Sequence, residues 1–152
     1  MDDVTLFLEL SALLTGLYDR LLKDLEDRVL NRRVAHEYAR RLQGTFPEKF
    51  PALLDAYKNL ATANPKPPIN DTLLAQLRAT PAFTSNEIVA RQIVNVWYFS
   101  QFEDETAELI DGGFYERGAV WQFIKAHPIG FSTQRHGYWT RNPEARNEKD
   151  LV

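Results

Sequence analysis

The side chains that could carry out acid–base or nucleophilic chemistry in this chain are its histidines and serines. They are His36, His127 and His136, with Ser11, Ser85, Ser100 and Ser132. A hydrolase of the strand–turn–helix type places its serine in a sharp turn flanked by glycines, and none of these serines has that setting. A triad built from distant segments stays open, because its members need not be neighbours in sequence.

Metal and cofactor binding have no clear signature in the sequence. The chain has no cysteine, which excludes thiolate zinc sites, disulfides and cysteine nucleophiles. His127 and His136 lack the spacing and the flanking carboxylates of a zinc site. Residues 103–105 lack the alternation and glycine of a calcium loop, and there is no nucleotide-binding glycine motif. We therefore expect no catalytic residues, no metal and no cofactor in this chain.

The two histidines near the C-terminus have a simple structural interpretation. His127 is expected to end a helix, where an imidazole can satisfy free carbonyl groups and interact favourably with the helix dipole. His136 precedes Gly137, a pair typical of a turn. Both are therefore expected to shape the chain rather than to form a site.

Length and charge limit the classes of protein. The chain has 152 residues and a formal net charge of −3, so we expect one domain and no nucleic-acid partner. The arginines at positions 32, 33, 40 and 41 are expected to form the solvated face of a helix. The N-terminus begins with two aspartates and carries neither a secretory nor a twin-arginine signal. The apolar run 4–18 is too short to span a bilayer, so we expect no membrane insertion. The compartment is then cytoplasmic, unless a targeting segment was removed.

Hydrophobic periodicity predicts six helices. They cover about residues 4–17, 31–44, 50–60, 70–79, 85–101 and 114–126. Asp2 or Asp3 is expected to cap the first and Asn31 the second, and Gly44 is expected to end the second. The proline-rich stretch 64–68 predicts a stiff loop. The fold class that follows is an all-α single domain over residues 1–152, with a helical part of about 3–127 and an irregular C-terminal strap of about 128–147.

The fifth and sixth predicted helices suggest different environments. Residues 87, 91 and 95 form one narrow polar stripe on the fifth helix, which predicts a central and nearly buried helix. A strand is the alternative for its β-prone segment 93–99. The sixth helix carries aromatic residues on two faces. Either both faces pack within the domain, or one face meets a partner.

Three C-terminal motifs and two helical ones resemble one protein family. The motifs are "Y-x-x-G-A-V-W" at 115–121, "A-H-P-x-G" at 126–130 and "G-Y-W-x-x-x-P" at 137–143, with "FLELSALLTGL" at 7–17 and "IVNVWYFSQF" at 93–102. Together they resemble the small subunit of membrane-bound, FAD-dependent sugar and polyol dehydrogenases, the sorbitol and fructose dehydrogenase small-subunit family. The resemblance covers nearly the whole chain and is densest over residues 88–143.

The resemblance implies an accessory role without a cofactor in this chain. In that family the large subunit binds FAD in a glucose-methanol-choline oxidoreductase fold, and a multihaem cytochrome c subunit, where present, passes electrons toward quinone. The small subunit is implicated in maturation, stability and export of the large one, at the periplasmic face of the inner membrane. Many relatives carry a twin-arginine signal, and this sequence departs from them there.

The expected partner-binding residues are aromatic anchors and the residues that shape the strap. They are Trp97, Tyr98, Phe114, Trp121, His127, Pro128, Gly130, Phe131, Gly137, Tyr138 and Trp139. The alternative is a stand-alone helical binding protein on the same scaffold, such as an inhibitor, adaptor or immunity-type protein, with no dehydrogenase partner. A small hydrolase that uses His127 or His136 is a third hypothesis.

Overall fold

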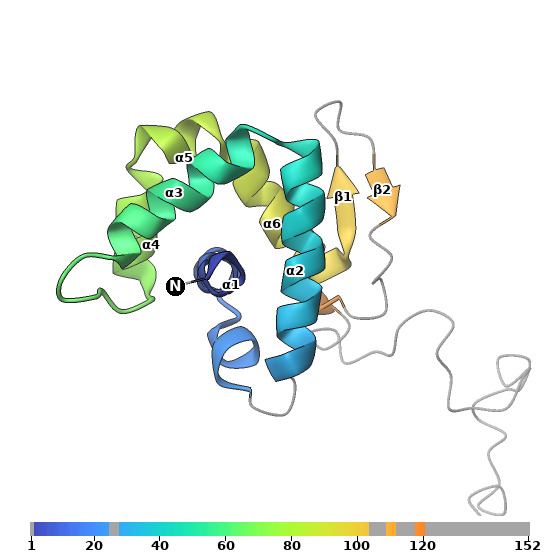
Figure 1. The fold of residues 1–152 in the computed structure, drawn as a ribbon, viewed down its shortest axis with the longest axis horizontal. Helices are drawn as coiled ribbons and strands as arrows, with labels where there is room; N and C mark the ends of the chain where they lie inside the picture. Colours follow the sequence, from blue (N-terminus) through green and yellow to red (C-terminus); the bar gives the residue numbers. More distant parts are fainter. Residues whose placement is uncertain (1, 25–27, 104–108, 112–117, 121–152) are drawn as a thin grey trace, which may run out of the picture.

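Helix α1 (Asp3–Thr15) lies at the centre of the fold. It contacts η1 (Asp19–Lys23), α2 (Arg28–Thr45), α3 (Lys49–Ala61), α4 (Asp71–Arg78) and α6 (Glu87–Phe99). Figure 1 shows it end-on in the computed structural model, with the other helices arranged around it. The structure describes residues 2–24, 28–103, 109–111 and 118–120. Over these residues the protein is an all-α single domain, as the sequence predicts. The described residues include seven helical segments.

Helix α1 is buried on more than one face. Seven of its thirteen residues are buried and they lie on nearly every face: Leu6, Phe7, Leu8, Leu10, Ser11, Ala12 and Leu13. The polar stripe expected on the helix near residues 85–101 is confirmed at two positions, because α6 (Glu87–Phe99) exposes Glu87 and Arg91 and buries six of its other residues. It is less enclosed than α1, which contacts more of the other helices. The central helix is the one whose sequence carries a single charge after its first turn, at Glu9.

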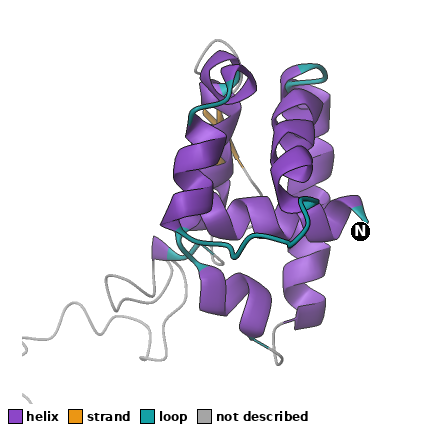
Figure 2. Cartoon of the chain, turned by 90° about the vertical axis from the view of Figure 1, so that its left-hand side faces the viewer, coloured by secondary structure: helices purple, strands orange, loops and turns teal. Residues whose placement is uncertain are grey.

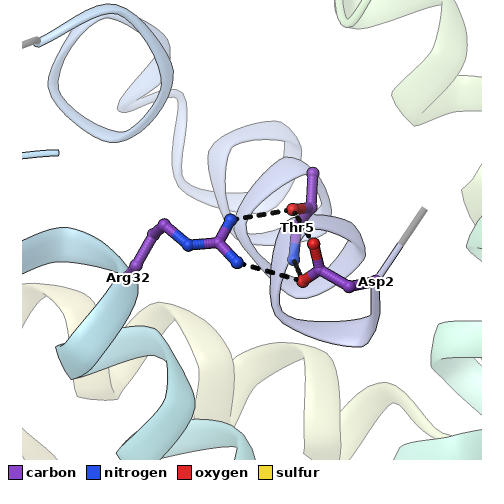
Figure 3. Close-up of polar contacts among 3 residues, drawn as sticks. All are labelled: Asp2, Thr5 and Arg32. Atoms are coloured by element: carbon purple, nitrogen blue, oxygen red, sulfur yellow. Dashed lines mark hydrogen bonds and ion pairs between the residues drawn. The ribbon is translucent and has the colours of Figure 1, made fainter. Parts of the chain in front are cut away.

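Both ends of α1 are capped by residues suited to the task. The Asp2 side chain accepts a hydrogen bond from the Thr5 backbone N–H at 3.0 Å and another from the Thr5 hydroxyl at 2.9 Å. Arg32 of α2 donates to both side chains, at 2.9 Å to Thr5 and 3.2 Å to Asp2 (Figure 3). At the other end Gly16 has a φ of 74°, the left-handed conformation that ends many helices. Asp2 is therefore the predicted cap, and Arg32 ties it to the next helix.

The Asp2 cap should make stability depend on pH. Its hydrogen bonds from Thr5, and the nearby Arg32 guanidinium, lower the pKa of Asp2 from 3.8 to about 2. Its contribution to the free energy of unfolding is thus complete above about pH 4 and is lost as the pH falls through 2. We expect Asp2→Ala to lower the melting temperature at pH 7 and to have a much smaller effect near pH 2. The control Asp3→Ala leaves these bonds intact. A loss for Asp2→Ala that persists unchanged at pH 2 would contradict the assignment.

The second helix starts earlier than the sequence suggested. A short π-helical turn, η1 (Asp19–Lys23), precedes α2 (Arg28–Thr45). Asn31 is therefore not a cap. It lies within α2, is buried, and its Nδ2 donates to the Arg20 carbonyl at 2.7 Å. Gly44 likewise lies inside the last turn of α2, one residue before its end.

The remaining helices follow the predicted order with one addition. They are α3 (Lys49–Ala61), α4 (Asp71–Arg78), α5 (Pro81–Ser85) and α6. Asn70 caps α4 by accepting from the Leu73 N–H at 3.1 Å. The Thr80 hydroxyl caps the five-residue α5 by accepting from the Phe83 N–H at 3.1 Å. The long loop between α3 and α4 lies across α1 (Figure 2).

A pair of short strands follows α6. Strand β1 (Gln101–Glu103) pairs antiparallel with β2 (Leu109–Asp111), with Phe102 opposite Ile110. The strand alternative for residues 93–99 was wrong, because those residues are helical. The sequence did not predict the strand pair that begins immediately after them. The predicted helix 114–126 lies outside the described residues apart from 118–120, and the predicted strap 128–147 lies entirely outside them.

Candidate partner-binding site

Two of the eleven expected partner-binding residues, Trp97 and Tyr98, lie in the described part of the chain, on the last turn of α6. The others lie outside the described residues. They are Phe114, Trp121, His127, Pro128, Gly130, Phe131, Gly137, Tyr138 and Trp139.

Trp97 belongs to the core. Its side chain is 5% exposed, and its ring meets the edge of the Tyr38 ring at a centroid distance of 5.2 Å and an angle of 84°. Among the residues that the structure describes, the indole Nε1 has no hydrogen-bond partner. A ring enclosed in this way cannot contact another protein unless the chain around it rearranges. Trp97 therefore positions its neighbours and is not itself a surface anchor in this structure.

Tyr98 joins the ends of two helices. Its hydroxyl donates to the Thr15 carbonyl at 3.0 Å, which satisfies a carbonyl in the last turn of α1. Its ring lies 6.3 Å from that of Phe99, which is 43% exposed. The half-buried ring of Tyr98 and the exposed ring of Phe99 thus form an aromatic surface at the end of α6.

Residues 118–120 lie against this same end of α6. The Ala119 N–H donates to the Trp97 carbonyl at 3.0 Å, and Ala119 is fully buried. Gly118 comes so close that an added Cβ would lie 2.4 Å from the Tyr98 carbonyl oxygen. Only glycine fits there without movement of the backbone. Two of the motifs that resemble the dehydrogenase small subunits, at 93–102 and 115–121, are therefore in direct contact.

The turn after α6 is built around a buried hydrogen bond. Ser100 has a φ of 55°, which ends the helix in the left-handed conformation, and its hydroxyl shares a 3.0 Å hydrogen bond with the Tyr38 hydroxyl. The Phe102 ring packs against Tyr38 at 5.8 Å, and the Arg41 guanidinium lies 5.5 Å from its centroid. These packed side chains support the end of α6, against which Gly118 lies.

A second buried serine lacks such a partner. Ser11 is fully buried in α1, and its hydroxyl makes no hydrogen bond within the described part of the chain. An unsatisfied buried hydroxyl costs about 1–3 kcal/mol, so we expect Ser11→Ala to raise the free energy of unfolding by about 1 kcal/mol. Ser100→Ala, which removes a satisfied hydroxyl, should lower it by about 1 kcal/mol. Urea denaturation of both variants measures the two changes. A loss for Ser11→Ala as large as that for Ser100→Ala would contradict the expectation.

Polar side chains fix the loop across α1. The Glu9 carboxylate accepts hydrogen bonds from the Tyr57 hydroxyl at 3.1 Å and from Lys66 Nζ at 2.7 Å. The burial of Tyr57 and the adjacent carboxylate both raise the pKa of its hydroxyl. Glu9 therefore remains partnered although its side chain is mostly enclosed, and Lys66 anchors the proline-rich loop. The sequence did not indicate this cluster, because its three members are far apart in the chain.

The arginine face on α2 is partly neutralised. Arg40 and Arg41 both donate to Glu37 at 2.8 Å, and these bonds lower the pKa of Glu37 to about 2. With Arg32 bound to Asp2, three of the four arginines that form the predicted solvated face have acidic partners. Arg33 is exposed and, within the described chain, has no ion pair.

Exposed apolar side chains are the feature that sequence reasoning missed. In the described residues the large apolar side chains with the greatest exposure are Leu22, Val29, Leu30 and Phe99. Val29 and Leu30 precede the predicted start of the second helix, so their face was not assigned. With α2 starting at Arg28, the side chains of Val29 and the buried Asn31 point about 200° apart around the helix axis. A correct helix start would therefore have predicted that Val29 faces solvent.

The side chains that could take part in catalysis or metal binding are dispersed over the described residues. His36 is exposed on α2 and lines a hollow of about 420 Å³ together with Asp3 and Asp55. Among the residues that the structure describes, no three acidic or histidine side chains are grouped as a metal site would require. None of the described helices is both long and apolar enough to cross a membrane.

The described residues thus form a small all-α domain. Aromatic side chains pack around Trp97 at the end of α6, and exposed apolar side chains lie on η1 and at the start of α2. Comparison of the chain with protein-family models, curated proteins and solved structures found no match.

Proposed function

We propose that this protein is a non-catalytic accessory subunit that binds, stabilises and helps to mature a large FAD-dependent sugar or alcohol dehydrogenase subunit. The partner in this proposal has the glucose-methanol-choline oxidoreductase fold and carries the FAD. A multihaem cytochrome c subunit belongs to the same complex where one is present. The proposal comes from the resemblance of five sequence motifs to the small subunits of such complexes.

One structural observation supports treating these motifs as a unit. Gly118, from the motif at 115–121, lies against the Tyr98 backbone, from the motif at 93–102, with no room for a side chain. The Tyr98 hydroxyl in turn bonds to Thr15 of the N-terminal motif. Residues of three motifs, at 7–17, 93–102 and 115–121, therefore meet at the end of α6.

Recovery of the complex from the native host tests the proposal. The full-length chain, carrying an affinity tag, should co-purify with a flavoprotein whose bound FAD gives a yellow colour and a flavin absorption spectrum. Deletion of residues 131–152 should abolish this recovery and leave the far-ultraviolet circular dichroism signal of the helices in place. Recovery of the flavoprotein with the deleted chain would exclude the strap as the docking element. Recovery of only a colourless partner would favour the stand-alone binding protein.

A further inference from the structure

The α3–α4 loop, residues 62–70, crosses the central helix with few attachments of its own. Figure 2 shows it running over α1 from the end of α3 to the start of α4. Seven of its nine residues are exposed, and the backbone from 64 to 69 makes no hydrogen bond to another described residue. Exposed backbone with few buried side chains is typical of segments that open locally while the rest of a domain stays folded.

One ion pair joins the middle of this loop to α1. Lys66 Nζ lies 2.7 Å from Glu9 Oε1, and the Lys66 side chain is 45% exposed whereas that of Glu9 is 12% exposed. Within the described part of the chain, no other hydrogen bond or ion pair links residues 64–69 to the rest of the domain. Because a partly buried pair is screened less than an exposed one, this single contact is well suited to hold the loop in place.

The end of the loop forms part of a hollow. Ile69 is half-buried against the core and lines a hollow of about 730 Å³, together with Leu22, Lys23 and residues 16–20. Two prolines separate Lys66 from Ile69. Since the φ angle of proline is fixed, these two residues leave the chain little freedom to move Lys66 and Ile69 separately. Movement of Lys66 away from α1 is therefore expected to shift Ile69 and one wall of the hollow.

We propose that the α3–α4 loop is a movable cover, held closed by the Lys66–Glu9 ion pair, and that its opening widens the hollow lined by Ile69 while the helices stay folded. When the pair is broken, the Glu9 carboxylate still accepts the hydrogen bond from the Tyr57 hydroxyl. The two helices that carry the loop are held independently of it, because α3 and α4 contact each other and both contact α1. The inference concerns this domain alone and does not depend on which partner the protein binds.

Distances between two spin labels on the full-length chain test the opening. The chain has no cysteine, so introduced cysteines are its only labelling sites. One label is attached to Asn64→Cys in the loop and the other to Leu22→Cys at the hollow. A control pair keeps the label at position 22 and places the other at Gln76→Cys on α4. All three positions are exposed, and circular dichroism checks that the helices persist after labelling.

We expect one main distance between the labels at 64 and 22 in pulsed electron–electron double resonance. Lys66→Met and Glu9→Gln each remove one charge of the pair. Either substitution should raise the population of a second, longer distance about fivefold, the scale set by one partly exposed ion pair. The matched control Lys58→Met removes an exposed charge from α3 and should leave the distances unchanged.

Three results would overturn the proposal. If Lys66→Met and Glu9→Gln both leave the distances between 64 and 22 unchanged, the ion pair does not hold the loop. If the second distance also appears between the labels at 76 and 22, α4 moves with the loop and the opening is not local. If Lys58→Met has the same effect as Lys66→Met, the effect does not come from the contact with Glu9.

Discussion

Replacing Phe7 with alanine is expected to lower the free energy of unfolding by about 3–5 kcal/mol. Phe7 is fully buried in the central helix, and its ring meets the edge of the Phe50 ring of α3 at a centroid distance of 5.7 Å. Its removal leaves a cavity between two helices that cannot close, because α1 is held by other helices as well. Since small domains have a total stability of about 5–15 kcal/mol, the loss is a large fraction of the whole.

Urea denaturation followed by circular dichroism measures this loss. The control Leu22→Ala removes a partly exposed apolar side chain and should change the free energy of unfolding by less than about 0.5 kcal/mol. A loss below about 1 kcal/mol for Phe7→Ala is outside the range for a large buried side chain. Such a result would contradict the central position of α1.

Gly118→Ala is expected to lower the free energy of unfolding by about 1–3 kcal/mol, the cost of forcing an extra carbon into a packed site. The added Cβ would lie 2.4 Å from the Tyr98 carbonyl oxygen, a backbone atom that cannot rotate away. The segment would then have to lift from α6, which would break the hydrogen bond between the Ala119 N–H and the Trp97 carbonyl. Hydrogen exchange at Ala119 reports that bond directly and should become faster.

Gly44 provides the matched control for this substitution. It lies inside α2, and a Cβ added there would have no neighbour within 4 Å. Alanine is favoured over glycine in a helix by about 1 kcal/mol, so Gly44→Ala should raise the free energy of unfolding. The same chemical change is thus expected to have opposite signs at two glycines. Equal effects at both positions would refute the close contact at Gly118.

Most of the helices could be predicted because their signals are local. The Asp2 and Asn70 caps depend on contacts within three residues, and Pro51 lies in the first turn of α3 as expected. The π-helical turn and α5 were missed because each has only five residues, too few for a period to be recognised. Asn31 was misassigned as a cap because its real partner, the Arg20 carbonyl, lies on a separate element.

The candidate site was harder to predict because burial is decided by tertiary packing. Trp97 and Tyr98 are adjacent aromatic residues, and sequence alone gives both the same potential as surface anchors. In the fold, Trp97 points into the core while the Tyr98 hydroxyl reaches the end of α1. The exposure of Val29 depends on a helix start three residues earlier than predicted, so a small error in a boundary concealed this exposed side chain.

The central position of α1 has a consequence for biosynthesis. Helix α1 is synthesised before the other described helices, yet its contact with Tyr98 spans 83 positions of the chain. Until α6 has emerged, the apolar faces that α6 covers remain accessible to chaperones and to other nascent chains. The domain therefore cannot complete its core segment by segment during translation, and its cooperative folding is deferred until most of the chain has been made.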